Sequence, residues 1–460
     1  MALGLGAGLG CARAGPRGPR VCGAVPRGAG AGVVVWAGRG GEAEDAGAGL
    51  VKAESTSGRG ALARGDVAVG AVRGEGSFGT VFEGTLLRGR KEGRVVAGGA
   101  KGDAVILKRA KPRVQDARVA LELELRLNEA AQGRAPGACA PFLGGIRVPE
   151  EEAGKKAPVQ GEVGPGLTLV WAKEGTRTVD GYLRAAGGSR GGGLEQLALV
   201  LGVAGSSAEF RAAPVACELG VVRVLMKDVL ESLAALHAGL VVHRDLKPEN
   251  VLVVGGVGVG QAAASKKKSK CFRLIDLGSA ACFATGTNVE NDTRTLAYAP
   301  PEDTVVPAGS PGTKRAFSEW GADRFDTFSA GVLLVQASVP ALRKGGAELT
   351  KFRDQLSACD YDLPAWRKAH PRASSSPVLD AAGGAGWDLA SGLLSGVAID
   401  PRTKAQGQGM DAKRFKKMRE GRLSATSALA HEFFTFDIAE NVDEDAQPSS
   451  GGLLKSLFGV

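Results

Sequence analysis

The stretch that decides the fold spans residues 241–250 and reads Val-Val-His-Arg-Asp-Leu-Lys-Pro-Glu-Asn. Asp245 has the carboxylate needed to orient an attacking hydroxyl and accept its proton, and Asn250 has an oxygen that can hold a magnesium ion. Lys247, between them, can neutralise charge on a transferred phosphoryl group. The alternative is a chance helix-to-turn sequence with a buried His243 and a surface aspartate. Several side chains suited to phosphoryl transfer fall within one short window, which favours such a site over a chance sequence.

This window resembles the catalytic loop of eukaryotic-type protein kinases. The lysine at 247, in place of the arginine or alanine usual in tyrosine kinases, resembles the serine/threonine branch. The resemblance implies an α+β, bilobal protein kinase fold. A small antiparallel-sheet N-lobe would carry one main helix, and a larger C-lobe would be mainly helical. It also implies ATP and Mg²⁺ as cofactors, with Asp245, Lys247 and Asn250 as catalytic residues.

A glycine-rich segment, residues 74–81, fits the pattern G-x-G-x-x-G-x-V. Dinucleotide-binding Rossmann units use the same glycine spacing, but their glycines open a helix. Here strand-like residues both precede and follow the glycines, which predicts a flap over nucleotide phosphates. The alternative is an ordinary hairpin in a chain with 70 glycines. The residues expected to contact ATP are Val72, Gly74, Glu75, Gly76, Ser77, Phe78, Gly79 and Val81.

Lys108 ends the segment Val-Ile-Leu-Lys at 105–108, which matches the strand whose lysine contacts the α- and β-phosphates. A lysine that ends an apolar strand is otherwise usually a surface residue. Its position after the glycine segment favours the phosphate-binding role. Residues 88–103, between the two motifs, are polar and glycine-rich and predict a hairpin extension.

Lys108 needs a glutamate partner on the next helix, which we predict over residues 116–132. The residues expected on its apolar face are Val119, Leu123, Leu127 and Ala130. Three glutamates compete for the pairing: Glu122, Glu124 and Glu129. We favour Glu129, because the following strand is expected to start at 141–143, and we keep Glu124 in reserve.

Asp276, in Leu-Ile-Asp-Leu-Gly, is the second expected magnesium ligand. The motif departs from D-F-G because Leu277 replaces phenylalanine, and a leucine can fill that apolar position. The activation segment would extend from Asp276 to Glu302. Thr293 and Thr295 are candidate phosphorylation sites, or else ordinary loop residues, and Arg244 is available to pair with a phosphorylated residue.

Two features of the C-terminal half resemble kinase elements that brace the site. Asp326 opens residues 326–331, which resemble the buried helix that holds the catalytic-loop backbone. Arg422 opens residues 422–434, which resemble the final kinase helix, and it is our candidate partner for Glu302.

The motifs together predict one catalytic domain over residues 66–436, with an N-lobe at 66–172, a C-lobe at 173–436 and a tail at 437–460. Part of the glycine excess falls in three segments that we expect to be flexible loops. These are 186–193, 255–264 and 383–386. A basic run, residues 265–270, is expected to be a solvated loop, with contact to anionic lipid or an acidic partner as the alternative.

The first 50 residues differ from the rest of the chain. Residues 1–40 contain five arginines and no acidic residue. This composition is typical of an organelle transit peptide, and the alternative is a disordered basic arm that stays attached. Without these five charges the formal net charge of +9 falls to +4, so we infer no nucleic-acid binding. No segment reaches the roughly 20 apolar residues needed to span a membrane, so any membrane contact would be peripheral.

The seven cysteines contain no C-x-x-C pair, and no zinc constellation is visible. Outside the first 50 residues they are expected to be free thiols. The spacing of Cys271 and Cys282 gives no support to a redox pair.

Several segments together resemble the plant and green-algal thylakoid kinases of the state-transition family. They are 76–84, 135–142, 169–175, 275–281, 285–288 and 300–302. The resemblance implies a chloroplast serine/threonine kinase, in the stroma or on the stromal thylakoid face, that acts on light-harvesting or photosystem proteins. The lumenal cysteine pair and membrane span of the state-transition branch are not visible, so the chain resembles the branch without that redox switch.

The same resemblance places the adenine-binding hinge at Trp171-Ala172-Lys173, whose backbone groups would bind adenine, and makes Val170 the gatekeeper. Simple packing of Trp171 between the lobes is compatible with this role. Two other readings are a pseudokinase-like scaffold and a general kinase of another compartment, such as the cytoplasm. The presence of Lys108, Asp245 and Asp276 argues against a scaffold.

Overall fold

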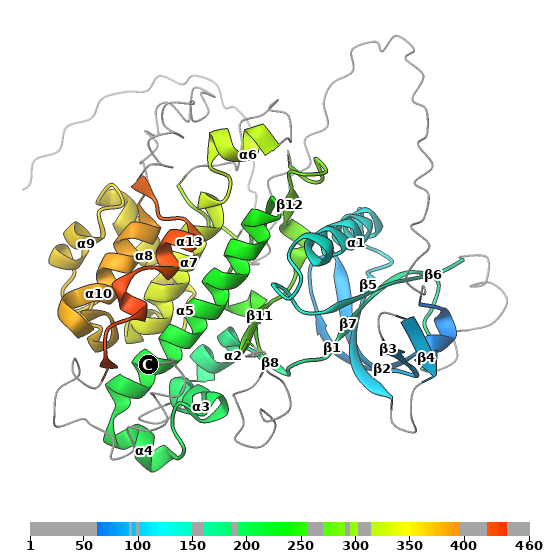
Figure 1. The fold of residues 1–460 in the computed structure, drawn as a ribbon, viewed down its shortest axis with the longest axis horizontal. Helices are drawn as coiled ribbons and strands as arrows, with labels where there is room; N and C mark the ends of the chain where they lie inside the picture. Colours follow the sequence, from blue (N-terminus) through cyan, green and yellow to red (C-terminus); the bar gives the residue numbers. More distant parts are fainter. Residues whose placement is uncertain are drawn as a thin grey trace, which may run out of the picture. The chain divides into compact units, whose positions relative to one another are not determined.

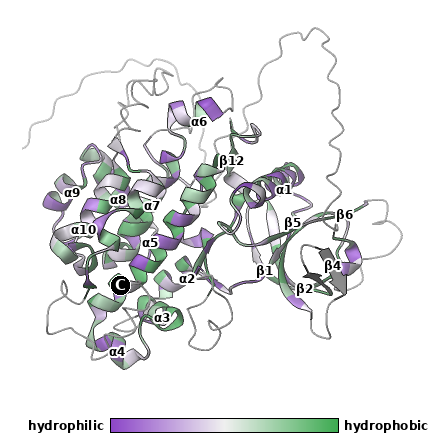
Figure 2. Ribbon diagram, viewed as in Figure 1, coloured by the Kyte–Doolittle hydropathy of each residue, from purple (hydrophilic) through white to green (hydrophobic). Residues whose placement is uncertain are grey.

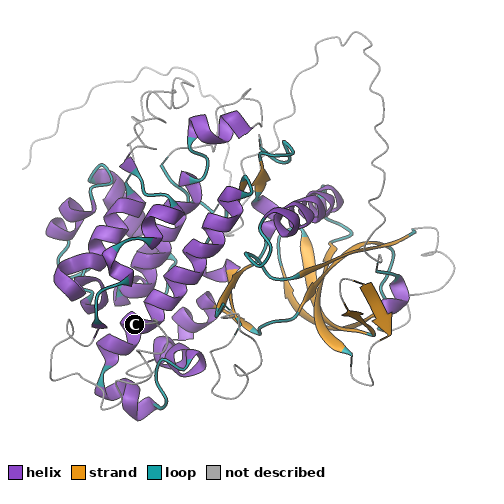
Figure 3. Cartoon of the chain, viewed as in Figure 1, coloured by secondary structure: helices purple, strands orange, loops and turns teal. Residues whose placement is uncertain are grey.

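The computed structural model describes residues 62–91, 94–97, 102–149, 161–185, 192–254, 270–289, 295–301, 314–395 and 421–438. These residues form a strand-rich N-lobe followed by a helix-rich C-lobe, as Figures 1 and 3 show. The predicted α+β, two-lobed fold is therefore confirmed. Within these ranges, none of the helices combines the length and the apolar character that a membrane crossing requires.

The N-lobe is built on a five-stranded antiparallel sheet with the strand order β1-β2-β5-β7-β6. In chain order its strands are β1 (Val67–Glu75), β2 (Gly79–Leu86), β5 (Asp103–Ala110), β6 (Phe142–Val148) and β7 (Gly166–Ala172). A separate hairpin of β3 (Arg88–Lys91) and β4 (Arg94–Ala97) lies between β2 and β5 in the sequence. It confirms the hairpin expected from residues 88–103.

The two faces of this sheet pack against different partners, because successive residues of a strand point to opposite sides. One face holds a buried cluster that includes Leu107 and Val170. The other face carries Leu169 and packs against the helix α1 (Ala117–Arg134). Lys108 is paired with Leu169 across β5 and β7, so its side chain belongs to the face that α1 covers.

Helix α1 buries a different face from the one that the sequence suggested. Its buried residues are Ala117, Leu121, Glu124, Leu125, Leu127, Asn128 and Ala131. Val119, predicted to be in the core, is instead 69% exposed. The helix contains apolar residues on several sides, so its own periodicity did not define the face that the sheet covers.

The C-lobe core is formed by three long helices, α5 (Pro214–Ala238), α7 (Arg324–Ser338) and α10 (Pro377–Leu394). Helix α5 begins with a proline, which suits the first turn of a helix, and Gly239 follows its last residue. Every residue of α7 after Arg324 is buried. A Cβ on Gly331 would lie only 2.8 Å from Leu394 of α10, so the glycine permits the close approach of α7 and α10.

Shorter elements complete the C-lobe. The helices are α2 (Val179–Arg184), α3 (Gly192–Leu201), α4 (Ser207–Ala212), α6 (Lys314–Trp320), α8 (Ala347–Ala358), α9 (Leu363–Ala369) and α13 (Ala425–Leu429). The short strands β8 (Arg177–Thr178), β10 (Val251–Val253) and β11 (Phe272–Leu274) form one sheet, and β9 (Val241–Val242) pairs with β12 (Ala281–Cys282). Figure 2 shows α1 and α9 as largely hydrophilic and α3 as largely hydrophobic.

Two expectations for the C-lobe need correction. Residues 383–386 are the expected loop only in part, because Gly383 and Gly384 form a non-helical turn with positive φ angles inside α10, whereas Gly386 is buried. Residues 422–434 contain only the short helix α13 and a 3-10 turn at Glu432–Phe434 in place of one continuous helix. The segments 255–264 and 265–269 lie outside the described residues.

Candidate active site

Asp326 of α7 holds the backbone of the 241–250 segment through hydrogen bonds. Its carboxylate accepts hydrogen bonds from the main-chain N–H groups of His243 and Arg244, each at 2.8 Å. His237 Nε2 lies 2.8 Å from the same carboxylate. Arg244 has a φ of 62°, a left-handed conformation that these bonds maintain in a non-glycine residue. The predicted bracing role of Asp326 is confirmed.

Asp245 lies at the centre of a set of polar side chains. Lys247 Nζ donates to Asp245 Oδ2 at 2.7 Å, and Asn250 Nδ2 donates to the same oxygen at 2.9 Å. Thr295 Oγ1 donates to Asp245 Oδ1 at 2.6 Å and accepts from Lys247 Nζ at 2.8 Å. The structure therefore brings together the three residues expected from the loop and adds a hydroxyl from the segment before residue 302.

Thr295 is a site residue that the sequence reasoning missed. The sequence makes it a candidate phosphorylation site or else an ordinary loop residue, and the structure bonds its hydroxyl to Asp245 and Lys247 within the site. Thr293 and Glu302 lie outside the described residues.

Lys108 is paired with Glu124, and the prediction of Glu129 is wrong. Lys108 Nζ lies 2.9 Å and 2.8 Å from the two carboxylate oxygens of Glu124, while Glu129 is exposed on α1. The two glutamates are five positions apart, and at 3.6 residues per turn they point to different sides of the helix. The error follows directly from the wrong choice of the buried face.

Asp276 is the second carboxylate on Lys108, at 3.1 Å from Nζ. Burial acts to lower the pKa of Lys108, but the carboxylates of Asp276 and Glu124 together raise it above its usual value. The ammonium group in turn holds the pKa of Asp276 below its ordinary range. Burial dominates at Glu124, whose pKa is raised to about 7 despite the nearby ammonium. Lys108 is therefore charged, and Glu124 can change its protonation near neutral pH.

The residues expected to bind magnesium suit that ion. Ile275 N donates to the Asn250 carbonyl oxygen at 3.0 Å, so the two ligand-bearing segments lie side by side. Asp276 has a φ of 64°, and its side chain is 46% exposed. A carboxylate and a side-chain amide oxygen are hard ligands, and Mg²⁺ commonly takes one or two such ligands together with water and substrate phosphates. No group of three or more His, Cys, Asp or Glu residues that could hold a metal occurs among the described residues.

Leu277, in the place of the D-F-G phenylalanine, fills an apolar position as expected. It is buried in the same core cluster as Leu127 of α1. Arg244 donates to the main-chain carbonyl groups of Ser279 and Ala280 at 2.6 Å and 3.1 Å. These bonds attach the catalytic loop to the segment that follows Asp276.

The glycine-rich segment has the predicted strand–turn–strand conformation. Strand β1 ends at Glu75, β2 begins at Gly79, and Gly76 N donates to the Gly79 carbonyl oxygen at 2.8 Å. A Cβ on Gly79 would lie 3.2 Å from Lys108 Cε, so the glycine segment passes close to the Lys108 side chain. Val72, expected to contact ATP, is 58% exposed on β1.

The expected hinge differs from the sequence interpretation in its hydrogen bonds. The main-chain N–H of Ala172 donates to Pro141 at 3.0 Å, and that of Lys173 donates to Ala104 at 3.0 Å. The Lys173 ammonium group pairs with Glu83 at 3.0 Å. The N–H donors of Ala172 and Lys173 are therefore used within the protein.

Val170 cannot serve as the gatekeeper, because it points to the sheet face away from α1 and is fully buried there. Trp171 is on the same face as Lys108 and packs against Phe142 with a ring separation of 5.3 Å. Its indole Nε1 donates to Asn128 Oδ1 of α1 at 3.1 Å. Trp171, and not Val170, therefore lies on the sheet face that carries Lys108.

Two further expectations from the sequence concern Arg422 and the cysteines Cys271 and Cys282. Arg422 is buried and donates to the main-chain carbonyl groups of Ser395 and Arg324, each at 2.7 Å. Cys271 and Cys282 are both free thiols.

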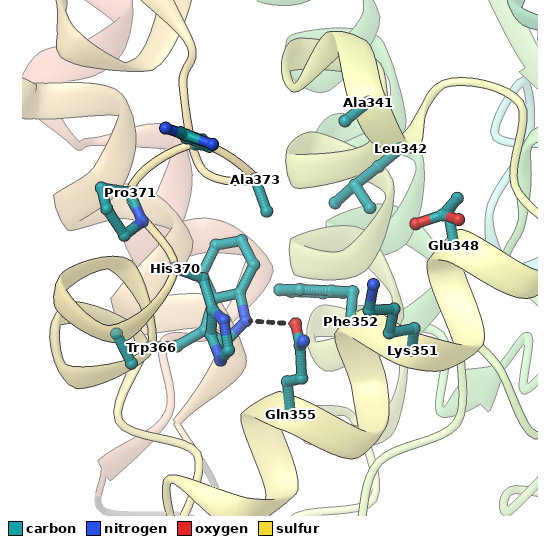
Figure 4. A pocket seen from close by; sticks show the side chains of 12 residues that line it. Ala341, Leu342, Glu348, Lys351, Phe352, Gln355, Trp366, His370, Pro371 and Ala373 are labelled. Carbon is teal, nitrogen blue, oxygen red and sulfur yellow. Dashed lines mark hydrogen bonds between the residues drawn. The ribbon is translucent and has the colours of Figure 1, made fainter.

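A pocket of about 330 Å³ lies in the C-lobe between α8 and α9 (Figure 4). The residues that line it include Leu342, Phe352 and Trp366. Trp366 Nε1 donates to Gln355 Oε1 at 3.2 Å. None of the residues described above for phosphoryl transfer lines it.

Comparison with known proteins gives concordant matches. A family model described as the protein kinase domain matches residues 199–434. The chloroplastic serine/threonine-protein kinase STN8 of Arabidopsis thaliana is 31% identical over 398 aligned residues, which cover 81% of this chain and 71% of STN8. The chloroplastic kinase STN7 of the same plant is 28% identical and covers 80% of this chain, but the chain covers only 57% of STN7.

A solved structure gives a similar result. The crystal structure of a Stt7 homologue from Micromonas algae, soaked with ATP, matches with a TM-score of 0.62 and 30% sequence identity. The match covers 85% of this chain and 98% of that chain.

Proposed function

The chain belongs to the protein kinase family and is a protein serine/threonine kinase, and from this premise we propose that it transfers the γ-phosphate of ATP to hydroxyl groups of thylakoid proteins in the chloroplast. The observation that carries the chemical part of the proposal is the arrangement around Asp245. The similarity to STN8 and STN7, both described as chloroplastic, supports the compartment. The basic, acid-free composition of residues 1–40 agrees with it.

Asp245 acts on the attacking hydroxyl of the substrate. Its Oδ1, which accepts a hydrogen bond from Thr295 at 2.6 Å, is the oxygen suited to accept one from a substrate serine or threonine. As the new O–P bond forms and the bond to the leaving ADP breaks, the hydroxyl proton passes to Asp245. Lys247, held 2.7 Å from the same carboxylate, offsets negative charge on the phosphoryl group in transfer.

Lys108 and Asp276 hold the phosphates from the opposite side. The Lys108 ammonium group binds the α- and β-phosphates and is kept charged and oriented by Glu124 and Asp276. Asp276 and the side chain of Asn250 would hold Mg²⁺, which supplies electrostatic stabilisation of the phosphate oxygens. The glycine flap at 74–79 brings main-chain N–H groups close to the phosphates.

The adenine ring is bound one residue beyond the expected hinge. The sheet uses the N–H groups of Ala172 and Lys173, whereas the Glu174 N–H makes no hydrogen bond among the described residues. Glu174 itself forms an ion pair with Arg273 of β11 at 3.3 Å. We therefore assign the main-chain donor for adenine to Glu174.

The experiment that tests this function measures phosphate transfer from labelled ATP by the full chain with Mg²⁺. Isolated thylakoids and a generic basic protein serve as parallel substrates, and Asp245→Asn serves as the inactive control. We expect labelling of thylakoid proteins that disappears with the control variant. Transfer to the basic protein alone would contradict the thylakoid substrates, and no transfer to any acceptor, the chain itself included, would favour a scaffold.

A further inference from the structure

Asn128 of α1 makes two side-chain hydrogen bonds in a buried position. Its Oδ1 accepts from the Trp171 indole N–H at 3.1 Å, and its Nδ2 donates to the main-chain oxygen of Glu124 at 2.8 Å. Asn128 is 4% exposed, so water cannot readily replace either partner. A buried amide that loses a partner is costly, and the bond to Trp171 is therefore a strong constraint on the position of α1.

Trp171 stands where β7 meets the hinge, on the sheet face that also carries Lys108. Residues of β7 that share this face include Leu169, which is the cross-strand neighbour of Lys108. The ring packs at a tilt of 56° against Phe142 and lies against the apolar side chains of α1. A single residue thus joins the nucleotide hinge to α1 through both packing and a directed hydrogen bond.

The bond to Trp171 and the ion pair to Lys108 depend on the same orientation of α1. Glu124 and Asn128 are four positions apart, so they lie one above the other on one side of the helix. A rotation or outward shift of α1 that breaks one contact would break the other. A continuous series of contacts therefore extends from the hinge through Asn128 and Glu124 to Lys108 and on to Asp276.

We propose that Trp171 and Asn128 are positioning residues for phosphoryl transfer, whose hydrogen bond holds α1 where Glu124 reaches Lys108. Both act through Glu124, and the proposal assigns neither of them a contact with the phosphates. The inference rests on the kinase activity alone, and any accepted protein substrate can be used to test it. Its failure is therefore distinct from failure of the thylakoid proposal.

The test begins with Trp171→Phe, which keeps an aromatic ring against Phe142 and removes the N–H donor together with part of the indole ring. Asn128 Oδ1 is then buried without this partner, and α1 spends less time in the competent position. Saturating ATP shifts α1 back to the competent position. The KM for ATP should therefore rise about tenfold while kcat stays within about twofold. Asn128→Leu removes the same bond from the side of α1 and should raise the KM similarly.

Combining the two changes separates a directed bond from general damage. In Trp171→Phe/Asn128→Leu neither partner of the lost bond remains buried and unpaired, so the KM should return to within about threefold of the native value. A KM for ATP that rises in the double variant by the product of the two single increases would overturn the proposal. So would a native KM in both single variants.

Trp366→Phe is a matched control, because Trp366 Nε1 also donates to a side-chain amide oxygen, that of Gln355 (Figure 4). This pair lies between α8 and α9 of the C-lobe, away from the phosphoryl-transfer residues. We expect a similar decrease in thermal stability to that of Trp171→Phe, with an unchanged KM for ATP. An equal rise in KM in this control would show that lowered stability alone accounts for the effect, and the proposal would fall.

Discussion

Two buried carboxylates, Glu124 in the N-lobe and Asp326 in the C-lobe, have pKa values shifted in opposite directions. They are 4% and 0% exposed, and burial acts to raise the pKa of both. At Asp326, hydrogen bonds and charge from His237 and His243 outweigh burial and lower the pKa. At Glu124 burial prevails over the attraction of Lys108, and the pKa rises to about 7.

The two carboxylates differ in the groups that donate hydrogen bonds to them. Asp326 accepts from two main-chain N–H groups, which cannot move without unfolding the loop they belong to. Glu124 accepts from one lysine side chain, which also pairs with Asp276. The carboxylate of the C-lobe is a permanent support of the main chain, whereas that of the N-lobe shares its one donor with a second carboxylate.

The strongest test of this contrast is Asp326→Asn. The two main-chain donors bond to different oxygens of the carboxylate, so the amide NH₂ group of asparagine must face one of them in either orientation. We expect a loss of about 3–5 kcal/mol in the free energy of unfolding, measured by denaturant titration. Asp354→Asn, on the exposed side of α8, is the control and should change the free energy by less than about 0.5 kcal/mol. A small effect of Asp326→Asn would mean that the catalytic loop holds its shape without this support.

Glu124→Gln should have the reverse profile, with a large effect on activity and a small one on stability. We expect kcat/KM for ATP to fall about 100-fold, which corresponds to about 2.7 kcal/mol, because Lys108 loses the partner that orients it. The free energy of unfolding should stay within about 1 kcal/mol, since the neutral amide also removes the cost of burying a charge. Glu129→Gln, the rejected assignment, should leave both quantities unchanged. Stability losses like those of Asp326→Asn would place Glu124 among the permanent supports.

The pH dependence of stability sharpens the comparison further. A carboxyl whose folded pKa is raised from 4.5 to about 7 binds its proton more tightly in the folded state. Its contribution to stability is therefore full below pH 4.5 and is lost as the pH rises through about 7. Relative to Glu124→Gln, the native protein should lose about 2 kcal/mol between pH 5 and pH 8 in denaturant titrations. A difference that stays constant over this range would contradict the raised pKa.

The smallest expected effect concerns Glu122, two residues from Glu124 on the same helix. It forms an ion pair with Arg147 of β6, with one oxygen–nitrogen distance of 2.7 Å, in a partly exposed position. Arg147→Gln should lower the free energy of unfolding by less than about 0.5 kcal/mol and leave kcat/KM for ATP unchanged, because solvent screens the pair. Thermal unfolding in low and high salt provides the measurement. A loss of activity would indicate that this exposed pair, too, positions α1.

Sequence reasoning was most successful where one short segment carries the whole requirement. The catalytic loop, the glycine flap and the Lys108 strand each place their functional residues within a few positions of one another. The relevant spacing is then visible without knowledge of the tertiary structure. The bracing role of Asp326 was also visible, because residues 326–331 resemble the kinase helix that holds the catalytic-loop backbone.

The errors arose where tertiary contacts choose between similar local options. Apolar residues surround much of α1, so the sheet, and not the helix periodicity, selected Glu124 over Glu129. On β7 a shift of one residue exchanges the two sheet faces, which is why Val170 was mistaken for Trp171. The role of Thr295 depends on a contact with Asp245 between residues far apart in the sequence.

The contacts around Asp245 have a consequence for the entropy of each turnover. Donors from Lys247, Asn250 and Thr295 fix both oxygens of its carboxylate in the folded protein. The torsional freedom of the side chain is therefore lost once, when the chain folds, and not again whenever a substrate arrives. The Asp245 carboxylate is therefore already oriented when a substrate hydroxyl arrives, and only the substrate still has to reach a reactive alignment.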